Sequence, residues 1–243
     1  MDTKLREIWQ QAFGDSDETL DAFFATGFSP DRYHYLTEND TVVSALYWFD
    51  CQLEGQKLAY LYAVATEASH RGKGLARRLM TETHEILRKQ GYAGAILVPG
   101  SGELFAMYEK LGYQTAGTVT ECFVRQGSTP VSLRRIDAAE FARLRRQYLP
   151  AGGVIQEGAT LSYLQTYCRF YAGADFLLTA SVDGDRLMAW ELLGNMDAAP
   201  GILRTLDLPQ GRFRTPGTGR DFAMYQPLTE NCPKPAYFGL ALD

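Results

Sequence analysis

The stretch from Thr66 to Ala76, which reads T-E-A-S-H-R-G-K-G-L-A, constrains this chain more than any other part of its sequence. It follows an apolar run, Leu58 to Ala65, that predicts a buried strand, and it precedes an amphipathic pattern, Leu75 to Gln90, that predicts a helix. A glycine loop between a strand and a helix N-terminus directs unpaired backbone N–H groups outward, where the helix dipole favours an anion. Side chains at Gly72 or Gly74 would keep a phosphate away from that backbone. The loop therefore predicts a diphosphate-binding site, and the alternative is a surface turn with solvated basic side chains.

Basic residues gather at this loop although the chain as a whole is acidic. Arg71, Lys73, Arg77 and Arg78 lie in or next to it, whereas the formal net charge of the 243 residues is -5. A negative overall charge opposes general binding to nucleic acid, so we expect no nucleic-acid partner. The local positive charge agrees with a phosphate ligand.

The composition is that of a globular protein, with 46% apolar and 22% charged residues. No apolar run reaches the length of a membrane span, and the first residues, MDTKLREIW, lack the apolar region of a signal peptide. We therefore expect a cytoplasmic protein with no membrane contact and reduced thiols. The histidines and cysteines have no metal-ligand spacing, so no metal site is expected: His34, His70, His84, Cys51, Cys122, Cys168 and Cys232.

Periodicity and turn signals predict an α/β fold (α+β in some schemes), built on a mixed, mostly antiparallel sheet flanked by helices. In chain order the first half is expected to form two helices, three strands, a crossover helix, a strand, a helix and a strand. The expected elements are helices over 5–13 and from the cap at Asp15 or Ser16, strands over 33–37, 41–52 and 58–65, a helix over 75–90, a strand over 93–98, a helix over 103–111 and a strand over 119–125.

Two motifs resemble those of the GNAT superfamily of N-acetyltransferases. Arg71, Gly74 and Ala76 meet the pattern R-x-x-G-x-[GA] of its acetyl-CoA pyrophosphate loop, and residues 99–113 read P-x-x-x-x-L-F-A-M-Y-E-K-L-G-Y. The resemblance covers residues 1–127 and implies an acetyl-CoA-binding GNAT domain there. The family usually begins with a strand before its first helix, and residues 1–4 are too short to supply one.

The resemblance also implies a set of site residues. Backbone groups of Val64, Ala65 and Thr66 would pair with the pantetheine arm of acetyl-CoA, and Tyr108 would act as general acid toward the departing thiolate. The pyrophosphate would be held, with support from Arg71, by Gly72, Lys73, Gly74, Leu75, Ala76 and Arg77. Ser101 stands where the family often has an asparagine, and Ala68 stands in place of a proline before the loop.

The sequence leaves open the role of Tyr108, the identity of the general base and the residues of the acceptor pocket. A phenol that donates a hydrogen bond to a thiolate helps it to leave, and the alternative for Tyr108 is a buried core aromatic. The glutamate that many members carry on the strand before the loop is absent from 58–65. Glu67, Glu121 and the C-terminal carboxylate of Asp243 are candidate bases. The aromatic residues Tyr33, Tyr35, Tyr47, Trp48 and Tyr62 are candidates for an acceptor pocket or for plain sheet core.

The second half contains an echo of the first. Residues 215–228, T-P-G-T-G-R-D-F-A-M-Y-Q-P-L, match residues 98–111 at eight of 14 positions, where average composition predicts about one. This similarity predicts a duplication, with a degenerate GNAT-like domain over 128–243 that lacks the glycine loop. Its expected elements are strands over 131–136, 176–182, 186–193 and 236–242 and helices over 138–148, 160–171 and 198–206. We expect it to wall part of the acceptor pocket, and the alternative is a second cofactor site.

The sequence thus predicts an acetyl-CoA-dependent transferase that acetylates a primary amine of a small molecule or peptide. The alternative is a non-catalytic module that binds acyl-CoA as a sensor or scaffold. An intact loop fits both hypotheses, and the tyrosine at position 108 favours the enzyme.

Overall fold

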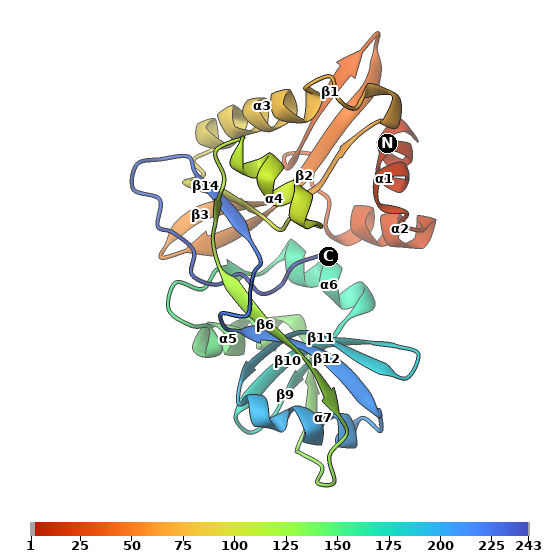
Figure 1. Ribbon diagram of the computed structural model, residues 1–243, viewed down its shortest axis with the longest axis vertical. Coiled ribbons are helices and arrows are strands. Elements are labelled where there is room, and N and C mark those ends of the chain that lie inside the picture. Colours follow the sequence, from red (N-terminus) through yellow and green to blue (C-terminus); the bar gives the residue numbers. More distant parts are fainter. Residues whose placement is uncertain (1–2, 243) are drawn as a thin grey trace.

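The computed structural model describes residues 3–242, which form two mixed sheets stacked along the long axis of the molecule (Figure 1). The first sheet has the strand order β1-β2-β3-β4-β14-β5, with β8 pairing with β2. The second has the order β13-β6-β12-β11-β10-β9-β7. In each sheet most neighbouring strands are antiparallel. One pair in each sheet is parallel, β3–β4 in the first sheet and β11–β12 in the second, and a helical crossover joins the two strands of each pair.

The predicted elements of the first half are present. Gly14 ends the first helix in a left-handed conformation (φ 74°), and Ser16 caps the second through its side chain. The elements are α1 (Thr3–Phe13), α2 (Asp17–Thr26), β1 (Tyr33–Glu38), β2 (Thr41–Leu53), β3 (Gln56–Thr66), η1 (Ala68–His70), α3 (Leu75–Lys89), β4 (Gly94–Leu97), α4 (Gly102–Glu109), β5 (Gln114–Thr115) and β6 (Thr118–Arg125).

The second half follows the prediction less closely. Its elements are β7 (Arg134–Ile136), α5 (Ala138–Tyr148), β8 (Ile155–Gln156), α6 (Ala159–Tyr167), β9 (Arg169–Ala172), β10 (Phe176–Asp183), β11 (Arg186–Gly194), η2 (Met196–Ala198), α7 (Ala199–Thr205), β12 (Gln210–Pro216), β13 (Arg220–Asp221) and β14 (Met224–Pro227). The helix expected over 160–171 ends at Tyr167, because the next residues pair as β9 with β7 and β10.

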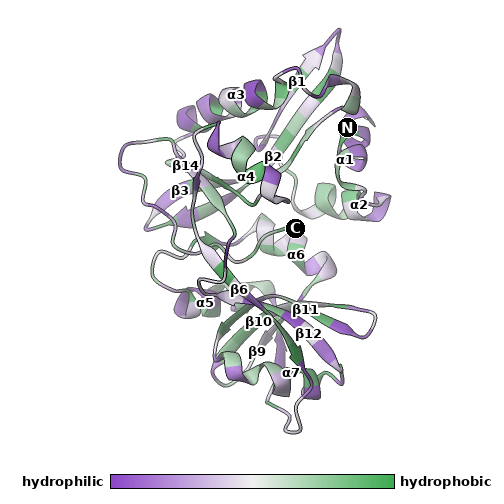
Figure 2. Ribbon diagram, in the orientation of Figure 1, coloured by the Kyte–Doolittle hydropathy of each residue, from purple (hydrophilic) through white to green (hydrophobic). Residues whose placement is uncertain are grey.

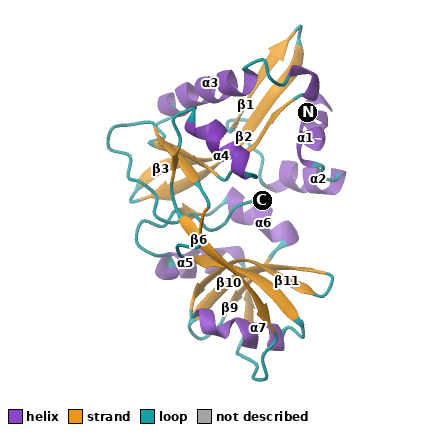
Figure 3. Ribbon diagram, in the orientation of Figure 1, coloured by secondary structure: helices purple, strands orange, loops and turns teal. Residues whose placement is uncertain are grey.

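Helices cover both faces of each sheet (Figure 3). In the first sheet α3 and α4 pack on one face, and α1 and α2 pack on the other. In the second sheet α7 covers one face, and α5 and α6 lie on the other, toward the first sheet. Hydrophobic residues concentrate in the central strands, and α3 is hydrophilic on its outer side (Figure 2). Within residues 3–242, no helix is long and apolar enough to cross a membrane.

Each half of the chain contributes strands to the sheet of the other half, β6 to the second sheet and β14, besides the short β8, to the first. β6, which precedes residue 127, pairs along its length with β12 in the second sheet. β14, which comes from the second half, lies between β4 and β5 in the first sheet. Figure 1 shows both crossings, with β6 descending into the lower sheet and the blue strand β14 in the upper one. A division after residue 127 therefore gives two segments, each of which carries a strand of the other's sheet.

The internal sequence echo does not mark equivalent structures. Phe105 to Tyr108 lie in helix α4, whereas the identical sequence at Phe222 to Tyr225 leads into strand β14. Tyr225 pairs with Ile96 and Gln114 on neighbouring strands. Residues 215–228 therefore do not form a loop and helix like those at 98–111, although the sequences are similar. Four residues are too few to fix a helix, so their neighbours decide the conformation.

The C-terminal segment 236–242 is not the expected strand. It is extended coil, with one isolated bridge between Gly153 and Tyr237. The buried side chain of Gln156 holds it instead, because its Nε2 donates to the Leu240 carbonyl (2.5 Å) and its Oε1 accepts from the Leu240 N–H (3.2 Å). A side-chain amide thus supplies the pairing that a strand would have supplied.

We expect residues 1–127 expressed alone to be insoluble or unfolded. The fragment lacks β14, which leaves β4 and β5 without their shared neighbour, and it carries β6 without β12. Solubility and circular dichroism of the fragment check this, and co-expression with residues 128–243 should restore a soluble complex. A soluble fragment that unfolds cooperatively by itself would contradict the requirement for strand exchange.

Candidate functional site

A cavity of about 890 Å³ opens where β3 and β4 separate. The two parallel strands pair only from Leu58–Gly94 to Tyr60–Ile96. Beyond this point they diverge, and the residues after the last pair line the cavity from both sides, as Leu61 to Val64 on β3 and Leu97 to Gly100 after β4. Backbone that has lost its sheet neighbour offers N–H and C=O groups to an extended ligand.

A bulge in β3 faces this opening. The pairs Tyr47–Tyr62 and Ala45–Ala65 leave Ala63 and Val64 together opposite the single residue Leu46. Ala63 has φ 51°, in the left-handed region that a residue with a Cβ adopts at a cost of about 1 kcal/mol or more. Bulges bend a strand and redirect its backbone groups, and they concentrate beside active sites. This bulge therefore distinguishes the cavity wall from ordinary sheet.

The glycine loop connects the end of β3 to α3, as predicted. Gly72 and Gly74 have φ 75° and 79°, and Gly74 is the N-cap of α3. The space next to both glycines, at the N-terminus of the helix, is open. A Cβ at either position would meet no protein atom within 4 Å. The Nε of Arg71 donates to the Thr66 carbonyl (3.0 Å) and fixes the loop to the strand end.

The other basic residues of the loop are exposed. Lys73 and Arg77 form no ion pair with any residue in the part of the chain that the structure describes. Their charge adds to the positive end of the α3 dipole, where the N–H groups of the first turn have no partner within the helix. The loop thus combines open space, unpaired donors and positive charge, and these are the requirements for holding a diphosphate.

Tyr108 lies at the base of the cavity, on the inner face of α4. Its side chain is only 6% exposed, and it lines the cavity together with Leu104. Burial raises the pKa of Tyr108 to about 12, and the ring packs against Tyr113 with centroids 5.6 Å apart. The phenol is therefore protonated over the whole physiological range and can donate a hydrogen bond or a proton.

The structure brings only some of the predicted site residues into one space. Val64 and Tyr108 line the cavity, and the loop 71–77 lies beyond the end of the same strand. Ala65 and Thr66 pair with β2, and Ala65 is buried. Ser101 is the exposed N-cap of α4 without a side-chain capping bond, next to the lining residue Gly100.

Neither glutamate proposed as a base lies in the cavity lining. A hydrogen bond from Lys4 (2.5 Å), together with His70, holds the pKa of Glu67 below its usual value. Burial opposes ionisation of Glu121, but hydrogen bonds from Arg220 and Arg214 outweigh it and hold the pKa of Glu121 low. Carboxylates engaged with cations are weak bases, so these two candidates are wrong. Asp243 lies outside the described residues.

The aromatic residues expected around the acceptor are mostly elsewhere. Of the five candidates only Tyr62 lines the cavity. Tyr47 is buried against α1 and α2. Trp48 lies on the opposite face of the sheet, where its indole N–H donates to the hydroxyl of Tyr92. The rings that do line it come from both halves of the chain: Trp9, Phe13, Tyr60, Tyr62, Tyr108, Tyr163, Tyr167, Trp190 and Phe222. No sequence signal links α1, α6 and β11, because only the stacking of the two sheets brings them together.

The second sheet has no loop comparable to residues 71–77. Between Leu193 and Pro216 the crossover consists of η2 and the short helix α7, whose first residues, Ala198 and Ala199, are buried. The absence of the glycine loop from this crossover agrees with the sequence. The side of the second sheet that faces the first contributes Trp190 and Phe222 to the cavity wall.

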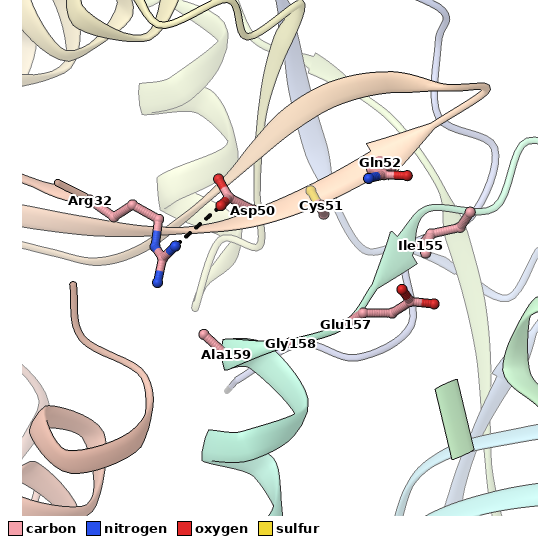
Figure 4. A pocket seen from close by; sticks show the side chains of 8 residues that line it. All are labelled: Arg32, Asp50, Cys51, Gln52, Ile155, Glu157, Gly158 and Ala159. Atoms are coloured by element: carbon pink, nitrogen blue, oxygen red, sulfur yellow. Dashed lines mark hydrogen bonds and ion pairs between the residues drawn. The ribbon is translucent and has the colours of Figure 1, made fainter. Parts of the chain in front are cut away.

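A smaller cavity of about 300 Å³ lies between β2 and the start of α6 (Figure 4). Its charged residues already have partners: Arg32 Nη1 lies 3.2 Å from Asp50 Oδ2, and Glu157 pairs with Arg146 at 2.6 Å. It contains none of the predicted site residues. Among residues 3–242, no group of histidine, cysteine and carboxylate side chains could hold a metal ion.

Comparison with known proteins points to the same region of the chain. Residues 3–116 match the sequence profile of the acetyltransferase (GNAT) domain. Over 74 residues the chain is 32% identical to L-2,4-diaminobutyric acid acetyltransferase of Halalkalibacterium halodurans, and over 65 residues it is 32% identical to N-acetyltransferase family 8 member 2 of Rattus norvegicus. These matches cover 29% and 26% of this chain, and 39% and 29% of the relatives, so the chain spans well under half the length of either relative.

The fold is similar over nearly the whole chain to that of a solved GCN5-related N-acetyltransferase from Kribbella flavida. The TM-score is 0.70 at 17% identity, and the alignment covers 93% of this chain and 69% of that one. At this identity the likeness concerns the fold alone, and it includes both sheets. The profile match covers the strand, the bulge, the glycine loop and Tyr108. Residues 3–116 of this chain are therefore similar to the GNAT acetyltransferase domain in sequence.

Proposed function

We propose that this protein is an N-acetyltransferase that moves the acetyl group of acetyl-CoA to a primary amine. One observation carries the proposal: β3 and β4 separate and leave a cavity. Tyr108 lines this cavity, and the glycine loop follows the end of β3. The loop beyond the end of β3 can then hold a diphosphate, and the cavity can hold an extended arm and a reacting thioester. The family's co-substrate, acetyl-CoA, has these three parts.

The pantetheine arm would lie along the bulged part of β3 and continue that sheet. Val64 and its neighbours would supply the backbone groups, and Leu75 to Arg77, with Gly72 to Gly74, would hold the diphosphate. The bulge at Ala63 turns the backbone toward the place where the thioester carbonyl would lie. N–H groups at that place would stabilise the negative charge that develops on the carbonyl oxygen.

The reaction is a direct transfer between two nucleophiles. The neutral amine attacks the thioester carbonyl, a C–N bond forms, and the C–S bond breaks as the tetrahedral adduct collapses. The amine proton passes to solvent, and the hydroxyl of Tyr108 donates to the departing sulfur. An amine of pKa near 10.4 is neutral in only about one molecule in 2,500 at pH 7, so loss of this proton is part of the cost of reaction.

The second half supports the site as a degenerate copy of the first. Both sheets have a parallel pair with a helical crossover, followed by a strand taken from the other half of the chain. That shared order, rather than the sequence echo, supports an ancient duplication with an intact part near residues 1–127 and a degenerate part near 128–243. The crossover between Leu193 and Pro216 offers no diphosphate site, so one molecule of acetyl-CoA per chain is expected.

The alternative, a module that binds acyl-CoA without turnover, would use the same loop. A protonated phenol in the reacting part of the cavity is superfluous for binding, and it favours the enzyme. The chain's acceptor is an amine under this proposal, as the name of its bacterial relative states for L-2,4-diaminobutyric acid.

Gly74→Glu is expected to abolish binding of acetyl-CoA while the protein stays folded. The substitution places a carboxylate where the diphosphate would lie, so that charge repulsion and steric exclusion act together. Acetyl-CoA at 100 times its Kd stabilises a protein by about 2.7 kcal/mol, and this stabilisation should disappear. The shift in melting temperature on addition of acetyl-CoA measures it.

Gly74→Ala is the matched control, because it imposes the same strain at φ 79° without the charge. It should lower the melting temperature of the free protein to a similar degree, and its Cβ alone should weaken binding of acetyl-CoA less than the carboxylate does, so that a reduced response remains. If acetyl-CoA stabilises the glutamate variant as much as the unmodified protein, the loop does not hold the diphosphate and the proposed function loses its support.

A further inference from the structure

The acceptor end of the cavity is built mainly from aromatic rings. From Trp9 on α1 they continue through Tyr62 on β3 to Tyr163 and Tyr167 on α6, with successive ring centroids 5.3, 6.2 and 5.5 Å apart. The indole of Trp190 on β11 follows at 5.9 Å from Tyr167. The faces and edges of such rings attract apolar chains, and their faces also attract cations.

A carboxylate stands at the beginning of this row. Asp15 follows the left-handed Gly14 at the corner between α1 and α2, and its Oδ2 accepts a hydrogen bond from the Trp9 indole N–H (2.7 Å). The side chain is partly buried and lines the cavity. It has no ion pair with any residue from 3 to 242, unlike the nearby Asp17 and Asp21, which both pair with Arg6.

The other charged groups of the cavity wall do not neutralise Asp15. Glu18, in the first turn of α2, adds a second carboxylate to the lining. The single cationic side chain in the lining is Arg220, whose Nη2 lies 2.9 Å from Glu121 and whose guanidinium stacks on Phe222. Arg220 is therefore already engaged, and the acceptor end presents a net negative charge within aromatic walls.

We propose that this end of the cavity is an ammonium-binding subsite and that the acceptor is a diamine. The inference rests on the proposed function, since it concerns the second substrate of the same reaction. The amine that attacks the thioester must be neutral, whereas a carboxylate beside aromatic rings selects a cation. One molecule satisfies both ends of the cavity if it carries an ammonium at Asp15 and a second, neutral amine near Tyr108.

The same geometry disfavours two other classes of amine. An amino acid with its carboxylate at this end would place a negative charge against Asp15 and Glu18. A simple alkylamine would fill the aromatic wall but leave the carboxylate without a counter-ion. The subsite therefore recognises the end of the acceptor that does not react.

Three acceptors of matched length test the proposal with the full chain at saturating acetyl-CoA: 1,5-diaminopentane, pentylamine and 6-aminohexanoate. Release of free CoA thiol gives kcat/KM for each. We expect the diamine to exceed pentylamine by roughly 10- to 100-fold, from an ion pair and cation–π contact in a partly desolvated site, and 6-aminohexanoate to be poorest. Equal kcat/KM for the diamine and pentylamine would overturn the proposal.

The variant Asp15→Asn provides the second test of the proposal. It removes the negative charge, while asparagine can still accept the hydrogen bond from Trp9. It should remove most of the advantage of the diamine by raising KM for 1,5-diaminopentane much more than KM for pentylamine. Asp17→Asn, whose carboxylate pairs with Arg6 outside the cavity, is the control and should alter neither. A loss of kcat with both amines, together with a shifted pH profile, would make Asp15 a base and overturn the subsite.

The measurements distinguish the transferase activity from the ammonium subsite. If no amine releases thiol although acetyl-CoA binds, then the proposed function is wrong, and the non-catalytic alternative replaces it. If thiol is released from all three acceptors without preference, then the transferase stands and the ammonium subsite does not.

Discussion

Replacing Tyr108 with phenylalanine is expected to lower kcat roughly 10²- to 10⁴-fold, with little change in KM for acetyl-CoA. The hydroxyl would act on a sulfur whose negative charge develops only as the C–S bond breaks, so its loss weakens the transition state more than the ground state. The ring remains and keeps its contact with Tyr113, so the folded structure should persist. Steady-state kinetics at saturating acetyl-CoA measure the effect.

The pKa of Tyr108 defines its role more closely. Burial raises it to about 12, above the value near 8.5 of a free thiol, and the hydroxyl has no hydrogen bond to any described residue. The proton is therefore held on the phenol, and the main contribution expected is a hydrogen bond to the leaving thiolate. Such a donor in a desolvated site is worth several kcal/mol in the transition state.

Tyr225→Phe is the internal control for this experiment. Tyr225 is as buried as Tyr108 and follows the same three residues, but it lies on strand β14 and does not line the cavity. Its hydroxyl should contribute nothing to turnover. Equal and small losses in the two variants would mean that Tyr108 has only a structural role.

Glu191→Ala is expected to cost about 3–5 kcal/mol of the free energy of unfolding. Its carboxylate receives two hydrogen bonds from Arg145, at 2.7 and 2.9 Å, and a third from the hydroxyl of Tyr237 at 3.0 Å. Glu191 and Arg145 are 1% and 2% exposed, so alanine leaves a guanidinium charge and a phenol without their partner in a dry interior. Urea unfolding gives the difference.

The same network holds the C-terminal segment in place. Arg145 also approaches Gln156 at 3.5 Å, and Gln156 binds both backbone groups of Leu240. Two residues further on, Leu242 lines the cavity. The Glu191 variant should therefore bind the acceptor more weakly, in addition to its lower stability.

An exposed ion pair is the comparison for this prediction. Glu140 makes two hydrogen bonds with Arg134 at 2.8 and 2.9 Å on the surface of α5, where water screens the charges. Glu140→Ala should leave the urea midpoint almost unchanged. A Glu191 variant that behaves like the Glu140 variant would show that the buried pair adds nothing to stability.

The sequence by itself determined the features that depend on neighbouring residues. The glycines at 72 and 74, the helix that follows them and the two N-terminal helices lie where the pattern predicted, because φ preference, capping and periodicity act over a few residues. The glycine loop and the helix that carries Tyr108 belong to this group. The matching of residues 3–116 to one domain family confirms the fold expected for them.

The tertiary structure decided the rest. Phe-Ala-Met-Tyr is helix at 105–108 and leads into strand at 222–225, because the second copy finds β4 and β5 as partners. The exchange of β6 and β14, the row of rings from Trp9 to Trp190 and the place of Asp15 in the cavity wall depend on contacts between elements that are far apart in the chain. Local propensity carries no information on such contacts, since each is fixed only when the two sheets stack and bury their shared face.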